Sequence, residues 1–149
     1  MEKIHEIMQK YNAQFCSIDY TNFLYTYQKA NKFEEGLKFF EQIKHHTNFA
    51  GMRITYNCAL NLYTSINKID DAMFLFDEIE THFKADHISY NTIIKALCNN
   101  KKIQLAYKYI NKLLDNLGQI EDIGENFFNY FLESCSDKKF YNIGIKTYK

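Results

Sequence analysis

The stretch ITYNCALNLYTSINKIDDAMFLF, residues 54–76, is followed by a stretch of the same design, ISYNTIIKALCNNKKIQLAYKYI, residues 88–110. Both open with isoleucine, a small hydroxyl residue, tyrosine and asparagine, and both have a short polar break between two apolar segments. Within each segment the apolar residues recur at the spacing of one face of an α-helix. Each stretch therefore predicts two helices joined by a tight turn.

The same design recurs along the chain with a fixed period. Tyr20, Tyr56 and Tyr90 lie 36 and 34 residues apart. A period in the mid-thirties is typical of helical hairpins stacked in an array, because one hairpin cannot bury its apolar face alone. We expect the three tyrosines to pack in the core. The same two intervals separate a small residue (Gly36, Ala72, Ala106), predicted where the two helices of a hairpin approach most closely, and an apolar residue (Phe40, Phe76, Ile110).

The composition agrees with an all-α fold. The 149 residues include no proline and 5 glycines, fewer than the turns of a β-rich protein need. The 18 basic and 18 acidic side chains give a formal charge of zero, which counts against strong nonspecific binding to nucleic-acid phosphates. No apolar run is long enough to span a membrane. The four cysteines are far apart, and we expect buried, reduced thiols.

No group of residues in the sequence indicates a reaction, a metal site or a cofactor. Catalytic combinations of Ser, Cys, His and carboxylates are missing at useful spacings, and no glycine-rich phosphate loop is present. His45 and His46 are adjacent, and neighbouring positions on a helix do not face one ligand. We therefore expect a protein that is not an enzyme and that needs no cofactor.

These residues resemble a known family. ITYN with the later NKIDDAMFLFDEI, and ISYN with KKIQLAYKYI, resemble the pentatricopeptide repeat (PPR), and IDYTNFLYTYQKANKFEEGLKFFEQI resembles it more loosely. The related tetratricopeptide repeat prefers a tryptophan near the start of its first helix, and this chain has none. The resemblance implies a right-handed α-solenoid of stacked helix-turn-helix repeats.

We expect one solenoid segment over the whole chain, which begins and stops in the middle of a repeat. It would then be a piece of a longer protein, or a partner would cover its apolar C-terminal end. The expected parts are the second helix of a partial repeat (1–16), three repeats (17–52, 53–86 and 87–120) and a degenerate partial repeat (121–149).

The resemblance also implies a function. PPR proteins bind single-stranded RNA, mostly in mitochondria and chloroplasts, and two side chains per repeat read one base. Asn57 with Asp86 matches the pair associated with uracil, whereas Thr21 with Met52 is not a standard pair. Asn91 is the first reader of an incomplete pair. The residues implied to sandwich bases are Ile18, Ile54 and Ile88, and the phosphate candidates are Lys29 and Lys95.

Alternatives stand beside these implied roles. Asp86 precedes a predicted helix and can cap it through a backbone N–H, and Asn57 and Asn91 can be merely tolerated in a first turn. Three repeats would read about three nucleotides, so we expect membership of a larger assembly, such as a mitochondrial ribosome. The alternative function is a protein-interaction scaffold. The resemblance implies a mitochondrion or plastid, although Glu2 and Glu6 do not suit a transit peptide.

Overall fold

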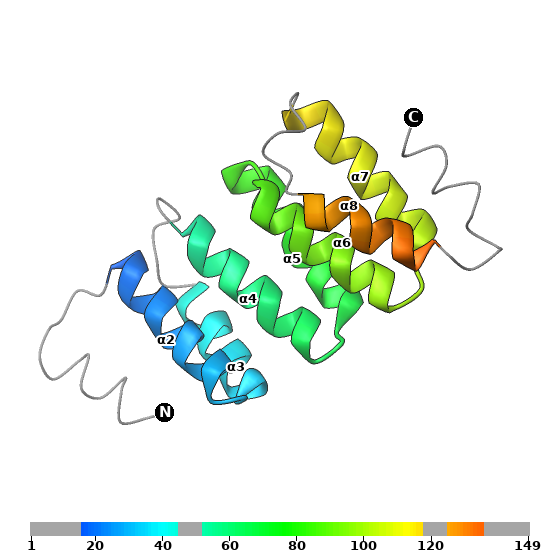
Figure 1. Cartoon of the computed structure of the whole chain (residues 1–149). Coiled ribbons are helices and arrows are strands. Elements are labelled where there is room, and N and C mark those ends of the chain that lie inside the picture. Colours follow the sequence, from blue (N-terminus) through cyan, green and yellow to red (C-terminus); the bar gives the residue numbers. More distant parts are fainter. Residues whose placement is uncertain (1–15, 45–51, 118–124, 136–149) are drawn as a thin grey trace, which may run out of the picture. The chain divides into compact units, whose positions relative to one another are not determined.

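The computed structural model describes residues 16–44, 52–117 and 125–135, and over these ranges it contains seven α-helices and no strand. The all-α repeat fold expected from the sequence is thereby confirmed for these ranges (Figure 1). The predicted helix within residues 1–16 lies outside the described residues, except for Cys16, as do His45 and His46. The helices are α2 (Ser17–Lys29), α3 (Phe33–Lys44), α4 (Arg53–Ser65), α5 (Ile69–Phe83), α6 (His87–Asn99), α7 (Ile103–Leu117) and α8 (Glu125–Ser134).

The chain divides into two compact units, and the division falls in the sequence of α4, where one unit ends at Ala59 and the other starts at Leu60. In the first unit α2 packs on α3. In the second unit α6 is the central helix, because it contacts α5, α7 and α8. No helix in the described part of the chain is both long enough and apolar enough to cross a membrane.

Aromatic rings make up much of the core of the first unit. Phe39 of α3 is 6% exposed, and the centroid of its ring lies 5.6 Å from that of Phe23 and 6.0 Å from that of Tyr27. Phe40, on the next position of α3, meets the ring of Tyr56 edge-on at 5.0 Å. Ring edges carry positive partial charge and ring faces negative, so this geometry adds to the gain from burial.

The second unit repeats this edge-on contact. The ring centroid of Phe76 on α5 lies 4.9 Å from that of Tyr90 on α6. The hydroxyl of Tyr90 donates a 2.5 Å hydrogen bond to Glu80 Oε1 and accepts one of 2.9 Å from Asn116 Nδ2. Lys112 also pairs with Glu80. Because buried polar groups need partners, this network joins α5, α6 and α7 at one point.

The three hairpin turns share one backbone geometry. Asn31, Asn67 and Lys101 each have a positive φ, of 55°, 61° and 56°. In each turn this residue's N–H bonds the carbonyl three residues back, and the next N–H bonds the carbonyl five residues back. This is the Schellman arrangement, which satisfies carbonyls at the end of a helix. The polar breaks of the sequence thus end one helix and start the next.

The predicted core positions are buried as expected. Tyr20, Tyr56 and Tyr90 are 7%, 1% and 0% exposed, and the small residues Gly36, Ala72 and Ala106 are all buried. The four cysteines are free thiols, as predicted. Their expected burial is confirmed for Cys98 and Cys135, but it is wrong for Cys16, which lies exposed at the start of α2, and Cys58 is half-buried.

Candidate functional site

A groove with a volume of about 420 Å³ lies in the second unit, lined by side chains of α4 and α6. Seven of its eight lining residues are polar or charged. Positions four apart on a helix share a face, and Asn91, Lys95 and Asn99 follow one another in this way along α6. We call this the polar groove. It is lined by Asn61, Thr64, Ser65, Asn91, Thr92, Lys95, Ala96 and Asn99.

Asn91 has an unsatisfied acceptor in this groove. Its side-chain Oδ1 is buried and has no hydrogen-bond partner among the described residues. A buried carbonyl oxygen without a partner costs about 1–3 kcal/mol relative to a satisfied one. Such an atom in a groove therefore favours a ligand that brings an N–H or O–H donor.

The hydroxyl groups of the groove also present acceptors. Thr64 and Ser65 donate their protons to the carbonyl of Asn61, at 3.0 and 2.7 Å. Thr92 donates to the carbonyl of Ile88 at 2.9 Å. A hydroxyl has one proton and two lone pairs, so each of these oxygens still offers lone pairs to a ligand. The groove wall around Asn91 is consequently rich in acceptors.

The opposite hydrogen-bonding character comes from Lys95 and Asn99. Lys95 is an exposed ammonium group that carries only donors, one helical turn beyond Asn91. Its Nζ lies 5.5 Å from the centroid of the Tyr130 ring. Asn99 accepts a hydrogen bond from the Tyr130 hydroxyl through its Oδ1. A ligand in the polar groove would meet acceptors near Asn91 and donors one to two turns further along α6.

Five of the residues implied by the resemblance lie in the first unit at or near the starts of α2 and α4. The side chains of Ile18 and Ile54 are 67% and 61% exposed, so their apolar surfaces are open to a ligand. Thr21 forms a 2.9 Å hydroxyl contact with buried Thr55 and donates to the Ser17 carbonyl. Met52 and Asn57 are 2% and 6% exposed.

Asp86 and Ile88 occupy the start of α6. Asp86 is the N-cap of α6, and its Oδ1 accepts hydrogen bonds from the Ser89 backbone N–H at 3.0 Å and from the Ser89 hydroxyl at 2.9 Å. The capping interpretation of Asp86 is confirmed. Ile88 is 47% exposed. Asn57 belongs to the first unit and Asp86 to the second, so their pairing stays a prediction.

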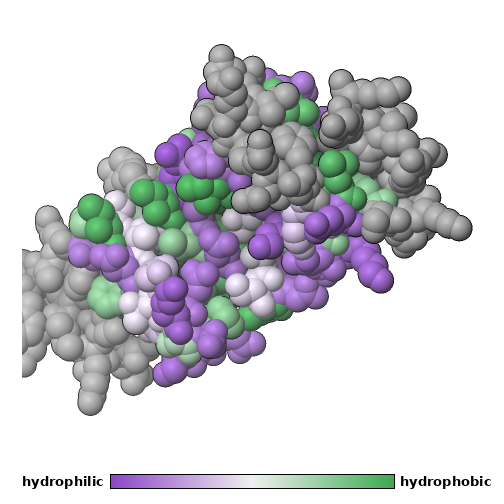
Figure 2. Space-filling model, viewed as in Figure 1, coloured by the Kyte–Doolittle hydropathy of each residue, from purple (hydrophilic) through white to green (hydrophobic). Residues whose placement is uncertain are grey.

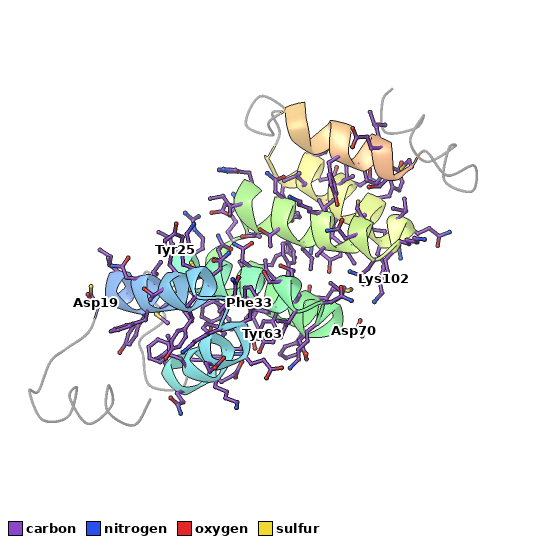
Figure 3. All side chains as sticks on the ribbon, turned by 60° about the horizontal axis from the view of Figure 1, so that its bottom comes forward. Asp19, Tyr25, Phe33, Tyr63, Asp70 and Lys102 are labelled. Carbon is purple, nitrogen blue, oxygen red and sulfur yellow. The ribbon has the colours of Figure 1, made fainter. Side chains whose placement is uncertain are left out.

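The lysines of the third hairpin differ in their surroundings. Lys102 pairs with Asp70 of α5 at 3.0 Å, and Figure 3 shows these two labelled side chains close together. Lys112 pairs with Glu80. In the first unit, Lys29 lies over the ring of Tyr25, 5.1 Å from its centroid, within one turn of α2. The charges of Lys102 and Lys112 are thus partly neutralised by acidic residues of the preceding hairpin. Lys95, in contrast, lines the polar groove.

Most of the described surface in Figure 2 is hydrophilic, with hydrophobic residues standing separately on it. No cluster of three or more His, Cys, Asp or Glu side chains suited to a metal ion occurs within the described ranges. Of the ten residues implied by the resemblance, Asn91 and Lys95 are brought together in the polar groove.

Five polar residues of the groove were not singled out from the sequence. The sequence does indicate a polar face on each predicted first helix, because polar residues recur there three or four positions apart, opposite the buried residues. The helix faces become a site only when the side chains of α4 and α6 meet, which periodicity within one helix does not show. The missed residues are Asn61, Thr64, Ser65, Thr92 and Asn99.

The comparison with known proteins agrees with the fold. Residues 2–113 match the family described as pentatricopeptide repeat-containing protein. No curated protein matches the chain. Because the family match covers more than half of the sequence, and the matched region contains the first two helical hairpins and most of the third, the chain belongs to the pentatricopeptide repeat-containing proteins.

Proposed function

We propose that this PPR protein binds single-stranded RNA in the polar groove, as part of a larger ribonucleoprotein assembly. The family is one of helical repeat proteins that associate with RNA or with other proteins, are generally not enzymes and are often organellar. The observation that carries the proposal is the buried, unpartnered Oδ1 of Asn91. A nucleobase edge can supply the missing donor.

The hydrogen-bonding character of the groove suits a nucleotide. Every nucleobase has N–H donors on its edges, and these complement the acceptors of Asn91 and Thr92. A phosphodiester has only acceptor oxygens and negative charge, which complement Lys95. The exposed Ile88, at the start of the same helix, offers an apolar surface for the face of a base. One nucleotide could therefore bind with its base at the acceptors near Asn91 and its phosphate at Lys95.

The test is a titration of short labelled RNA homopolymers with the wild-type chain and with Asn91→Ala. Loss of one base hydrogen bond is expected to weaken binding about fivefold. Because Asn91 Oδ1 has no partner to lose, Asn91→Ala should leave the melting temperature unchanged or raised. Asn111→Ala, an exposed asparagine of α7 outside the groove, is the matched control. Equal affinities of the wild type and Asn91→Ala would remove the proposed role of Asn91.

Asn57 and Asp86 remain a second proposed base contact, with a preference for uridine. Asp86→Asn keeps an oxygen for the Ser89 N–H and so preserves the helix cap, while it removes the carboxylate charge. We expect a loss of uridine preference in an Asn57→Ala, Asp86→Asn double variant at low and moderate salt. The proposed location is a mitochondrion or plastid, in an assembly such as a mitochondrial ribosome. Organelle fractionation with a tagged full-length protein would test the location.

The second candidate is a protein-interaction scaffold, and the groove has one feature that favours it. Asn61 and Asn91 each carry both a donor and an acceptor, which suits the alternating N–H and C=O groups of an extended peptide. A peptide ligand would bind with weak salt dependence, whereas RNA releases counterions and binds more weakly as salt rises. Absence of binding to all four homopolymers at low salt would favour the scaffold.

A further inference from the structure

Tyr130 of α8 contacts two residues of the polar groove although it does not line the groove. Its ring lies under the ammonium group of Lys95, with 5.5 Å between Nζ and the ring centroid. Its hydroxyl donates a hydrogen bond to Oδ1 of Asn99. Both partners belong to α6 and line the groove one and two helical turns from Asn91.

The hydrogen bond fixes the orientation of the Asn99 amide. An asparagine side chain has one acceptor oxygen and one donor NH2 group. Because the Tyr130 hydroxyl bonds to the oxygen, it favours the orientation of the Asn99 amide in which the NH2 group is available to a ligand. The pKa of Tyr130 is raised, first by desolvation and then by the nearby Cys98 and Glu133, so the hydroxyl keeps its proton and stays a donor at neutral pH.

The ring restricts Lys95 in a similar way. A lysine ammonium group is attracted to the face of an aromatic ring, and this contact holds a long, flexible side chain near the groove. Lys29 of the first unit also has a ring partner, but that partner, Tyr25, is on its own helix. The partner of Lys95 comes from a different helix, so the docking of α8 on α6 determines where this charge lies.

We propose that Tyr130 is a positioning residue that makes Lys95 and Asn99 a donor-rich subsite for a phosphodiester oxygen of the bound strand. The proposal rests on the proposed function, since it needs RNA in the polar groove. Tyr130 itself does not touch the RNA. It aims the ammonium group and the amide NH2 group at the same end of the groove, opposite the acceptor of Asn91.

The experiment measures RNA affinity of the full chain against salt concentration for the wild type, Lys95→Gln, Tyr130→Leu, Tyr130→Phe and the double variant Lys95→Gln, Tyr130→Leu. Each lost phosphate contact lowers the slope of log K against log salt by about 0.7 on a single strand. Lys95→Gln should show this decrease. Tyr130→Leu should show part of this decrease and bind RNA about two- to fivefold more weakly. The double variant should have the same salt slope as Lys95→Gln.

Tyr130→Phe separates the two contacts. It keeps the ring under Lys95 and removes the hydroxyl, so the salt slope should stay at the wild-type value while the affinity falls. A merely structural role of Tyr130 would alter the melting temperature without this difference between the Leu and Phe variants. Lys108→Gln, an exposed lysine of α7 outside the groove, is the control for net charge.

The outcomes separate this proposal from the proposed function. If the wild type binds RNA, and Tyr130→Leu keeps both its affinity and its salt slope, the positioning role is overturned and RNA binding stands. If the effects of Lys95→Gln and Tyr130→Leu on the slope are fully additive, Tyr130 does not act through Lys95, and the role is likewise overturned. If the wild type binds no strand at low salt, the proposed function fails and the positioning role fails with it.

Discussion

The ring of Tyr90 meets the ring of Phe76 nearly edge-on, with centroids 4.9 Å apart and planes inclined at 70°. Phe40 and Tyr56 make the same contact in the first unit, at 5.0 Å and 87°. In both cases the tyrosine near the start of one repeat packs on a phenylalanine from the second helix of the preceding repeat. The period of the sequence therefore corresponds to a contact that joins consecutive hairpins.

We predict a measurable coupling between Phe76 and Tyr90. In a double-mutant cycle with Phe76→Leu and Tyr90→Leu, the coupling should be about 0.5–1.5 kcal/mol, because the edge-to-face contact exists only when both rings are present. Urea unfolding followed by circular dichroism gives the four free energies. The cycle with Phe40→Leu and Tyr56→Leu should give a similar value. Coupling indistinguishable from zero in both pairs would contradict the role assigned to this contact.

The hydroxyl of Tyr90 contributes separately from its ring. Tyr90→Phe keeps the ring but removes the hydrogen bonds to Glu80 and Asn116. Because one of these partners is a carboxylate, we expect a loss of about 1.5–3 kcal/mol in the free energy of unfolding. Tyr107→Phe, a half-buried tyrosine of α7, is the comparison. A loss no greater than that of Tyr107→Phe would mean that the network adds no stability.

Lys101 is the least suited of the three turn residues to its backbone conformation. A positive φ brings the Cβ close to the carbonyl oxygen, and asparagine tolerates this better than lysine does. Lys101→Gly should therefore raise the free energy of unfolding by about 0.5–1 kcal/mol, after the greater freedom of glycine in the unfolded chain is allowed for. Asn31→Gly should raise it less. Thermal unfolding of both variants measures the difference, and a destabilised Lys101→Gly would contradict it.

The helices, core tyrosines and turns were predictable from the sequence because each follows from local spacing. A period fixes Tyr20, Tyr56 and Tyr90 on equivalent faces, and the polar breaks mark where each helix ends. The special backbone of Lys101 was not predictable, because neither glycine nor asparagine stands there to indicate a positive φ. Only the equivalence with the asparagine at position 31 or 67 would have suggested it.

The candidate site was predictable only in part. Resemblance pointed to Asn91 and Lys95, whereas Asn61 and Tyr130 enter through contacts between helices that lie far apart in the sequence. The pairing of Lys102 with Asp70 could not be predicted either, because these two residues belong to different hairpins. Charge counts alone do not show which lysine lines the groove.

Asp86 has a structural role that any functional test must allow for. Asp86→Ala should lower the free energy of unfolding by about 1 kcal/mol, because the Ser89 N–H loses its acceptor at the start of α6. Asp86→Asn should retain most of the stability, and Asp115→Ala, an exposed aspartate of α7, should change it little. Chemical denaturation of the three variants measures this. Equal stability of Asp86→Ala and the wild type would contradict the capping role.

Buried thiol and phenol groups predict a loss of stability in alkaline solution. Burial raises the pKa of Cys98 from 9.0 to about 11 and that of Tyr109 from 10.0 to about 12. As the pH rises above 9, the unfolded chain loses the Cys98 proton while the folded chain keeps it, so the unfolded state binds fewer protons. Stability must then fall with increasing pH between about 9 and 11.

We expect Cys98→Ala to be less stable than the wild type at neutral pH but to lose less stability between pH 9 and pH 11, since it lacks one of the groups that titrate differently in the two states. Urea unfolding at a series of pH values, with a phosphine reductant present, measures both effects. Cys16→Ala, which removes the exposed cysteine, should follow the wild-type pH dependence. If Cys98→Ala and Cys16→Ala declined equally, the alkaline loss would have to arise from the other groups whose pKa burial raises, which are Cys58, Cys135 and tyrosines such as Tyr109.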